Sequence, residues 1–299
     1  MQPLPLVRKL LFPLLAALAT SASMAHARAV RNIPYAGTAN ERQMLDVYAP
    51  ERNGENRPVV VWVHGGGWQR GDKSELAQGS PGQNELKPQA FVERGCVFIA
   101  MNYRFIPVVT LQEMAGDVAK AIRWAHQHAR EYGGDPDSLF VMGHSAGAQL
   151  SALVCTDERY LKAEGLSFKV IKGCVPVDGG TFYPLLQIET HLAQEASFRL
   201  KFPVGGEREL ASVLYVAKGK GIPPFLILHI ADNPASGTAL QSVILGKVLQ
   251  DAEVPAKVIA VPGKTHATLN ADLGLPGDLA TQALFEFVAE QTRRSRKFP

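Results

Sequence analysis

Ser145 lies at the centre of Gly143–Gly147, which reads Gly-His-Ser-Ala-Gly, a pattern in which serine can act as a nucleophile. The apolar run 138–142 before it is typical of a strand, and the alanine- and leucine-rich run 146–155 after it is typical of a helix. A serine on a sharp strand-to-helix turn presents its hydroxyl above the sheet, and glycine neighbours leave room for the two elements to approach. The pattern predicts a nucleophilic Ser145; a tight turn without chemistry is the alternative.

A second segment supplies groups that could stabilise an oxyanion. The strand-like run 59–63 leads directly into His64–Trp68, which reads His-Gly-Gly-Gly-Trp. Glycines leave backbone N–H groups bare, and one donor aimed at a tetrahedral oxyanion lowers the barrier by roughly 3–4 kcal/mol. A flexible surface loop would explain neither the apolar strand nor the closing tryptophan. The predicted oxyanion donors are the N–H groups of Gly66, Gly67 and Ala146.

A serine hydroxyl needs a base at neutral pH, and His266 is the best placed of the eight histidines. It ends the loop 262–266 after the strand-like run 257–261. His64 belongs to the glycine loop, and strand alternation is expected to point His144 away from the serine. The other histidines fall in a helix, a core strand, the leader or a segment without a clear assignment. His266 is therefore predicted to be the general base.

The base requires a carboxylate to fix its tautomer. Asp232 follows the strand-like run 225–230, and Asp178 stands at the end of another, in 175–180. Asp232 is preferred, because Ser145, Asp232 and His266 then follow one another in the order Ser, Asp, His. Asp178 remains the alternative.

These motifs, taken in order, resemble the α/β-hydrolase superfamily, and within it the hormone-sensitive-lipase-like carboxylesterases and the kynurenine-formamidase-like proteins with an HGGxW loop. The resemblance implies a serine ester hydrolase with Ser145, His266 and Asp232 as its triad, acting through an acyl-serine intermediate. A formamidase or amidase and a non-catalytic binding protein on the same fold are the alternatives. The segments that carry the resemblance are Leu45–Pro50, His64–Trp68, Asn102–Arg104, Gly143–Gly147, Asp232 and His266.

The elements around these motifs are those of one α/β domain. The chain has 299 residues, of which 46% are hydrophobic, enough for a full core. Strand-like and helical runs alternate, which favours a mostly parallel twisted sheet with helices on both faces. The predicted strands are 45–50, 58–63, 96–102, 138–143, 170–177, 225–230 and 255–261, and the predicted helices are 117–132, 145–155, 237–251 and 279–292.

The first 27 residues have the pattern of a signal peptide, which leaves 28–299 as the catalytic domain. Arg8 and Lys9 precede an apolar stretch too short for the roughly 20 residues of a membrane span. Ala25-His26-Ala27 matches a signal-peptidase site, so cleavage after Ala27 and export to the periplasm or medium are expected. No lipid anchor is expected, since the first cysteine is Cys96.

Charge and cysteine content suggest no further partner. Without the leader, 29 basic and 28 acidic residues remain, so neither nucleic acid nor an anionic membrane is an expected partner. The basic tail 293–297 is interpreted as a solvated chain end. Neither metal-ligand spacing nor a phosphate-binding loop is found, so no cofactor and no metal are predicted. Cys155 and Cys174 are expected near one another, either bridged or, as we favour, as buried free thiols.

The substrate is the least defined part of the prediction. Residues 181–222 lie between two predicted strands and are the expected cap over the site. Trp68 is expected to contact substrate and to narrow the entrance, which favours small or medium esters as small-molecule substrates. The apolar residues of the cap would either line an acyl pocket or pack it against the body; they are Phe182, Tyr183, Leu185, Leu186, Phe198 and Phe202.

Overall fold

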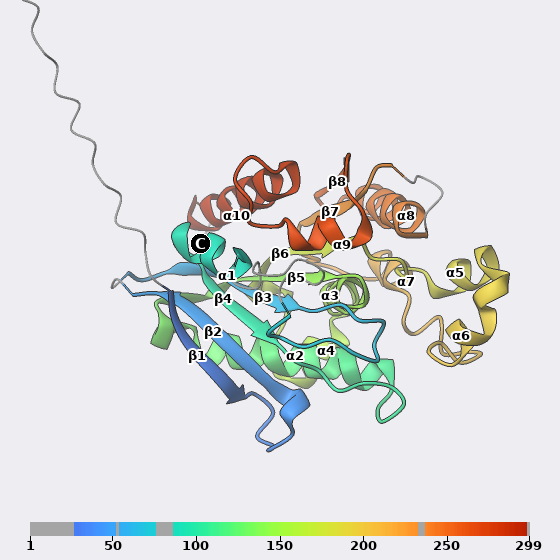
Figure 1. Ribbon diagram of the computed structural model, residues 1–299, viewed down its shortest axis with the longest axis horizontal. Helices are drawn as coiled ribbons and strands as arrows, with labels where there is room; N and C mark the ends of the chain where they lie inside the picture. Colours follow the sequence, from blue (N-terminus) through green and yellow to red (C-terminus); the bar gives the residue numbers. More distant parts are fainter. Residues whose placement is uncertain (1–26, 52–53, 76–85, 233–236, 298–299) are drawn as a thin grey trace, which may run out of the picture.

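The computed structural model describes residues 27–51, 54–75, 86–232 and 237–297, which form an eight-stranded sheet flanked by helices (Figure 1). The predicted leader, apart from Ala27, lies outside the described residues. The strand order is β1-β2-β4-β3-β5-β6-β7-β8. The strands are β1 (Ala27–Pro34), β2 (Met44–Pro50), β3 (Arg57–Val63), β4 (Val97–Met101), β5 (Gly134–His144), β6 (Ile171–Val177), β7 (Phe225–Ile230) and β8 (Ala256–Val261).

In the spatial order given above, neighbouring strands are parallel from β4 through β3 to β8. At the edge of the sheet, β2 is antiparallel to β4 and β1 is antiparallel to β2. The strand β5 is central: it pairs with β3 through Val141 and Val61 and with β6 through Val141 and Cys174. Parallel strands end at one edge of the sheet, where ligands bind in open α/β sheets. The segments after β3, β5, β6 and β8 therefore meet at this carboxyl edge.

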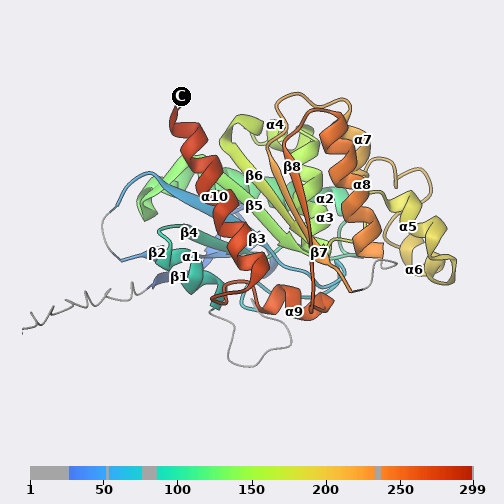
Figure 2. The ribbon, with the colours of Figure 1, turned by 90° about the horizontal axis from the view of Figure 1, so that it is seen from above.

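Helices cover both faces of the sheet. Figures 1 and 2 show α1 and α10 on one face and α2 on the other. The helices are α1 (Leu86–Glu93), α2 (Leu111–His128), α3 (Ala146–Thr156), α4 (Arg159–Ala163), α5 (Pro184–Thr190), α6 (Glu195–Arg199), α7 (Ser212–Val216), α8 (Gly237–Asp251), α9 (His266–Ala271) and α10 (Leu279–Lys297).

The strand β3 illustrates why its sequence is apolar throughout. Val59, Val61 and Val63 face the core formed with α2 and α3, while Val60 and Trp62 face the core formed with α1, α9 and α10. Side chains alternate between the faces of a strand, so a strand covered on both faces is apolar at every position. The predicted α/β-hydrolase architecture, with helices on both faces, is confirmed.

Most predicted elements occur within a few residues of their expected bounds, and the differences have local causes. The helix α2 begins at Leu111, six residues before the predicted start, because Thr110 and Glu113 form a capping box. The edge strand β1 and the short helices α1, α4 to α7 and α9 were not predicted. The helix α10 continues to Lys297, so the basic tail belongs to a helix and does not follow it.

All three cysteines are buried and free, which agrees with the favoured interpretation. Cys155 and Cys174 are hydrogen-bonded neighbours, and burial raises the pKa of Cys174 well above its ordinary value. In the part of the chain that the structure describes, no helix is long and apolar enough to cross a membrane.

Candidate active site

Ser145 occupies the turn between β5 and α3 in a strained backbone conformation, with φ 55° and ψ −116°. Its N–H donates to the carbonyl of Val177 at the end of β6, at 3.0 Å. A Cβ at Gly147 would lie 2.1 Å from the carbonyl oxygen of Val63, and one at Gly143 would lie 2.4 Å from the carbonyl oxygen of Gly147. Both glycines of the motif are therefore required by close backbone approach, and the turn is held to β3 and β6.

The glycine loop after β3 lies directly against this turn. A Cβ at Gly65 would lie 3.2 Å from Cβ of Ser145. Gly66 has φ +116°, and its Cβ would lie 2.0 Å from the carbonyl oxygen of Arg70, so no larger residue fits there. Among the described residues, no group accepts a hydrogen bond from the N–H of Gly66, Gly67 or Ala146.

His64 is the first residue of the glycine loop, and its imidazole ring is neutral. Its Nδ1–H donates to the carbonyl of Gly65 at 2.6 Å, and its Nε2 accepts from Arg42 at 3.3 Å. Its ring stacks on Tyr103 at 4.4 Å between ring centroids, and the Tyr103 hydroxyl donates to the carbonyl of His64. Burial lowers the pKa of His64 to about 4. The loop therefore packs on a neutral imidazole, which accepts a hydrogen bond from the Arg42 guanidinium.

His266 is the first residue of α9, with Thr265 as the N-cap. Its Nδ1 lies 2.6 Å from Oδ2 of Asp178. Because a carboxylate accepts, Nδ1 carries the proton in this contact, and in the neutral ring Nε2 is left bare. The side chain of His266 is 47% exposed, so the ring is accessible at the surface.

Asp178 follows β6 and is completely buried. Its Oδ1 accepts from the N–H of Ile230 at 3.2 Å, and the side chain of Thr238 also donates to the carboxylate. Burial alone would raise the pKa of Asp178, but the hydrogen bonds, first of all from His266, outweigh it and lower the pKa below its ordinary value of 3.8. The carboxylate is therefore ionised and fixed in place.

The choice of Asp232 as the partner of His266 is corrected by this geometry. Asp232 is exposed, and its Oδ2 accepts the N–H of Gly263 at 2.7 Å. It stabilises the turn that leads to His266 instead of contacting the imidazole. Asp178 lies closer because β6 is the immediate neighbour of β5, which carries Ser145. The order Ser, Asp, His holds for either aspartate and could not separate them.

His144 is also placed differently from the prediction. Instead of standing apart from the site, its ring packs against that of His266 at 4.5 Å between centroids, and its Nε2 lies 3.0 Å from the carbonyl oxygen of His266. Strand alternation describes one strand alone, and it could not show that α9 packs against His144.

Two lysines hold the helix that carries His266. Lys264 pairs with Asp272 and Asp278, at 2.8 Å each, and so ties the turn before α9 to the segment after it. The ammonium group of Lys87, from α1, is buried above the ring of Trp62 and donates to the carbonyl of Asn270 near the end of α9. Burial lowers the pKa of Lys87 to about 7.

Trp68 closes the glycine loop and is only 5% exposed. Its Nε1 donates to Oε1 of Gln149 on α3 at 3.2 Å, and its ring meets Phe202 edge-on at 5.4 Å. Phe182 and Phe202 of the 181–222 segment are fully buried, so these two pack the segment against the body. Tyr183 and Phe198 are half-buried. That Trp68 contacts substrate remains a prediction.

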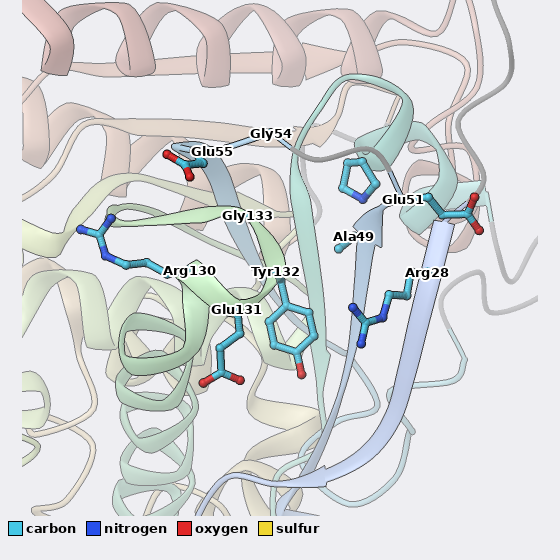
Figure 3. Close-up of a pocket in the computed structure, with 10 residues that line it drawn as sticks. Arg28, Ala49, Glu51, Gly54, Glu55, Arg130, Glu131, Tyr132 and Gly133 are labelled. Carbon is cyan, nitrogen blue, oxygen red and sulfur yellow. The ribbon is translucent and has the colours of Figure 1, made fainter.

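A hollow of about 350 Å³ lies at the other edge of the sheet (Figure 3). It is lined by one residue of β1, by the end of β2 and by the segments before β3 and β5, with a mixture of charges: Arg28, Ala49, Pro50, Glu51, Gly54, Glu55, Arg130, Glu131, Tyr132 and Gly133. Ser145, Asp178 and His266 instead follow the carboxyl ends of β5, β6 and β8. The described residues include no group of three His, Cys, Asp or Glu side chains that could hold a metal ion.

Comparisons with known proteins agree with this geometry. The BD-FAE family model matches residues 45–173, which contain the glycine loop and Ser145. The chain is 32% identical over 245 residues to a probable isoprenylcysteine alpha-carbonyl methylesterase of Arabidopsis thaliana, covering 76% of this chain and 49% of that protein. Esterase LipQ of Mycobacterium tuberculosis is 26% identical over 285 residues, with 88% and 62% covered. The chain spans about half the length of the first of these relatives.

Solved structures show the same fold. A truncated carbohydrate esterase from gut microbiota superposes with a TM-score of 0.73 at 20% identity, covering 91% of this chain and 99% of that one. Esterase B from Lactobacillus rhamnosis gives a TM-score of 0.73 at 22% identity, with 91% and 88% covered. The chain has the α/β-hydrolase fold. Its resemblance to carboxylesterases, inferred above from the motifs, is confirmed.

Proposed function

We propose that this protein is a serine carboxylesterase in which Ser145 is the nucleophile, His266 the general base and Asp178 the acid that orients the base. The observation that carries the proposal is the 2.6 Å contact between Nδ1 of His266 and the buried Asp178 carboxylate, because it leaves Nε2 free to accept a proton at the strained Ser145 turn. The esterase names of the sequence relatives support the same reaction class.

The first half of the reaction transfers the acyl group to the enzyme. Oγ of Ser145 attacks the ester carbonyl while its proton passes to Nε2 of His266, and Asp178 stabilises the resulting imidazolium. The carbonyl oxygen becomes an oxyanion, for which the N–H groups of Gly66, Gly67 and Ala146 are the proposed donors. The C–O bond to the alcohol then breaks, His266 returns the proton to the leaving alcohol, and an acyl-serine remains.

The second half releases the acid by the same route. Water gives a proton to Nε2 of His266 and attacks the acyl carbonyl, and the oxyanion forms again in the same place. Its collapse breaks the bond to Oγ, which takes the proton back from His266. One ester and one water are consumed, and one acid and one alcohol are formed, without a cofactor.

Small or medium esters are the proposed substrates. Trp68 and Phe202 form a buried wall directly after the glycine loop, which leaves less room for a long acyl chain than an open groove would.

We further propose that 181–222 acts as the cap and that residues 1–27 are removed on export. Cleavage after Ala27 would remove one residue of β1 and leave residues 28–34 to pair with β2. Mass spectrometry of exported protein should find Arg28 at the N-terminus; an intact Met1 would contradict this.

The test is the release of p-nitrophenol from acetyl, butyryl and octanoyl esters by wild type and by Ser145→Ala. Turnover in wild type should fall by at least about 10⁴-fold in the variant, with acetyl and butyryl esters preferred. Matched p-nitroanilides check whether esters are favoured over amides. A Ser145→Ala variant with wild-type turnover would remove the nucleophile assignment, and preference for the anilides would replace the esterase with an amidase.

A further inference from the structure

His144 joins three parts of the site. It is the last residue of β5, directly before Ser145, and is 4% exposed. Its ring lies 4.5 Å from that of His266, tilted by 39°. A Cβ at Gly65 would lie 3.1 Å from its Nδ1, so its other side faces the glycine loop. The buried side chain of His144 thus contacts both His266 and the glycine loop, and Ser145 is the next residue in the chain.

The protonation state of His144 follows from its partners. The carbonyl oxygen of His266 can only accept, so the 3.0 Å contact requires a proton on Nε2 of His144. Burial, together with the neighbouring His266 and Lys87, lowers the pKa of His144 to about 3. The ring is therefore neutral near pH 7, with Nε2 protonated and Nδ1 bare. A neutral donor supports His266 without opposing the charge that His266 takes up.

The helix α9 needs such support. It has six residues, far fewer than the roughly 12–15 at which an isolated helix becomes marginally stable in water. The His266 ring is 47% exposed, so much of its surface has no protein packed against it. Its orientation depends on Asp178 at Nδ1, on the His144 ring against its face and on the bond from His144 to its carbonyl.

We propose that His144 is a positioning residue for the esterase reaction, which holds His266 at Ser145 through the hydrogen bond from its Nε2–H to the His266 carbonyl. This inference rests on the proposed function, since it assigns His266 the role of base. The hydrogen bond joins the first residue of α9 to the last residue of β5, directly before Ser145. A shift of α9 relative to β5 therefore requires this bond to break.

Two substitutions separate the hydrogen bond from simple packing. His144→Gln retains an N–H donor of similar reach but removes the ring, and His144→Phe retains the ring shape but removes the donor. We expect His144→Phe to lower kcat by about 10- to 100-fold with KM changed less than about twofold, because the base is misplaced while substrate contacts remain. His144→Gln should keep kcat within about threefold of wild type.

The competing explanation gives the opposite order. If His144 only fills space, His144→Phe should be as active as wild type and His144→Gln should be the impaired variant; that result would overturn the proposal. Phe287→Leu is the control, since Phe287 packs edge-on against Phe140, four residues before His144 in β5, and its truncation should lower stability alone. Melting temperatures and titration of active serine with a fluorophosphonate correct each rate for unfolded protein.

A measurement on wild type tests the proposal even if both variants unfold. The ¹⁵N shifts of the His144 ring should show a neutral imidazole protonated at Nε2 from pH 5 to 8. A ring protonated at Nδ1 alone would overturn the assigned hydrogen bond. Because Ser145→Ala tests the nucleophile independently, failure of the His144 proposal would leave the esterase proposal standing.

Discussion

Asp178 and Asp232 end neighbouring strands of one sheet, yet they serve different purposes. Asp178 is fully buried and receives hydrogen bonds from His266, Ile230 and Thr238. Asp232 is exposed and receives one from Gly263. A carboxylate can orient a base only when its own position is fixed, and burial among donors fixes it. Position at a strand end is thus necessary but does not assign the role.

The largest effect is expected when the charge of the buried Asp178 carboxylate is removed. Asp178→Asn should lower kcat/KM by about 10⁴-fold, because an amide can present its N–H to Nδ1 and favour the wrong tautomer of His266. Hydrolysis of p-nitrophenyl butyrate measures the loss, with circular dichroism as the check on folding. A variant with more than a tenth of wild-type kcat/KM would return the role to Asp232.

The second prediction concerns the glycine loop, which also depends on a fixed backbone. Gly66→Ala should lower kcat/KM by about 10²–10³-fold, since the methyl group meets the Arg70 carbonyl and displaces the proposed oxyanion donors. Gly37→Ala is the control, because Gly37 has φ +69° and no neighbouring atom within 4 Å. Equal activity of the two variants would contradict the role of the loop.

The third prediction uses pH to reveal groups that burial keeps uncharged. The pKa of His64 is lowered to about 4 and that of His144 to about 3. As the pH falls below about 6.5, these two histidines become protonated in the unfolded chain while they remain neutral in the folded chain. Each histidine should lower the free energy of unfolding by up to about 1.4 kcal/mol per pH unit as the pH falls from 6.5 to 4. Urea unfolding at several pH values gives the free energy of unfolding as a function of pH. This dependence on pH should be weaker for His144→Gln than for wild type; an unchanged dependence would mean that His144 is not buried in its neutral form.

The smallest effect is expected at the exposed carboxylate. Asp232→Asn should change kcat/KM by less than about threefold, since an amide oxygen can still accept from Gly263 and surface substitutions rarely cost more than about 0.5 kcal/mol. Measured beside Asp178→Asn, it isolates burial as the difference between the two residues. A loss at Asp232 as large as that at Asp178 would remove the distinction.

The sequence predicted the fold and most of the site because these depend on local patterns. Apolar runs identified the strands from β2 to β8. Short glycine motifs indicated Ser145 and the loop after β3 as candidate site residues, and the loop after the last strand indicated His266. The acid depends on which strand lies beside β5, and the contact of His144 depends on how α9 folds back. Neither is encoded in a local run of residues. The capping box at Thr110 and Glu113, in contrast, was a readable signal for the start of α2.

The edge-on contact between Trp68 and Phe202 has a consequence for redesign. The tryptophan is continuous with the glycine loop, and the phenylalanine belongs to the 181–222 segment. A segment grafted from another esterase to alter selectivity would therefore also change what supports the loop. A chimaera would need to import its own counterpart of Trp68, so these two parts should be exchanged as one module.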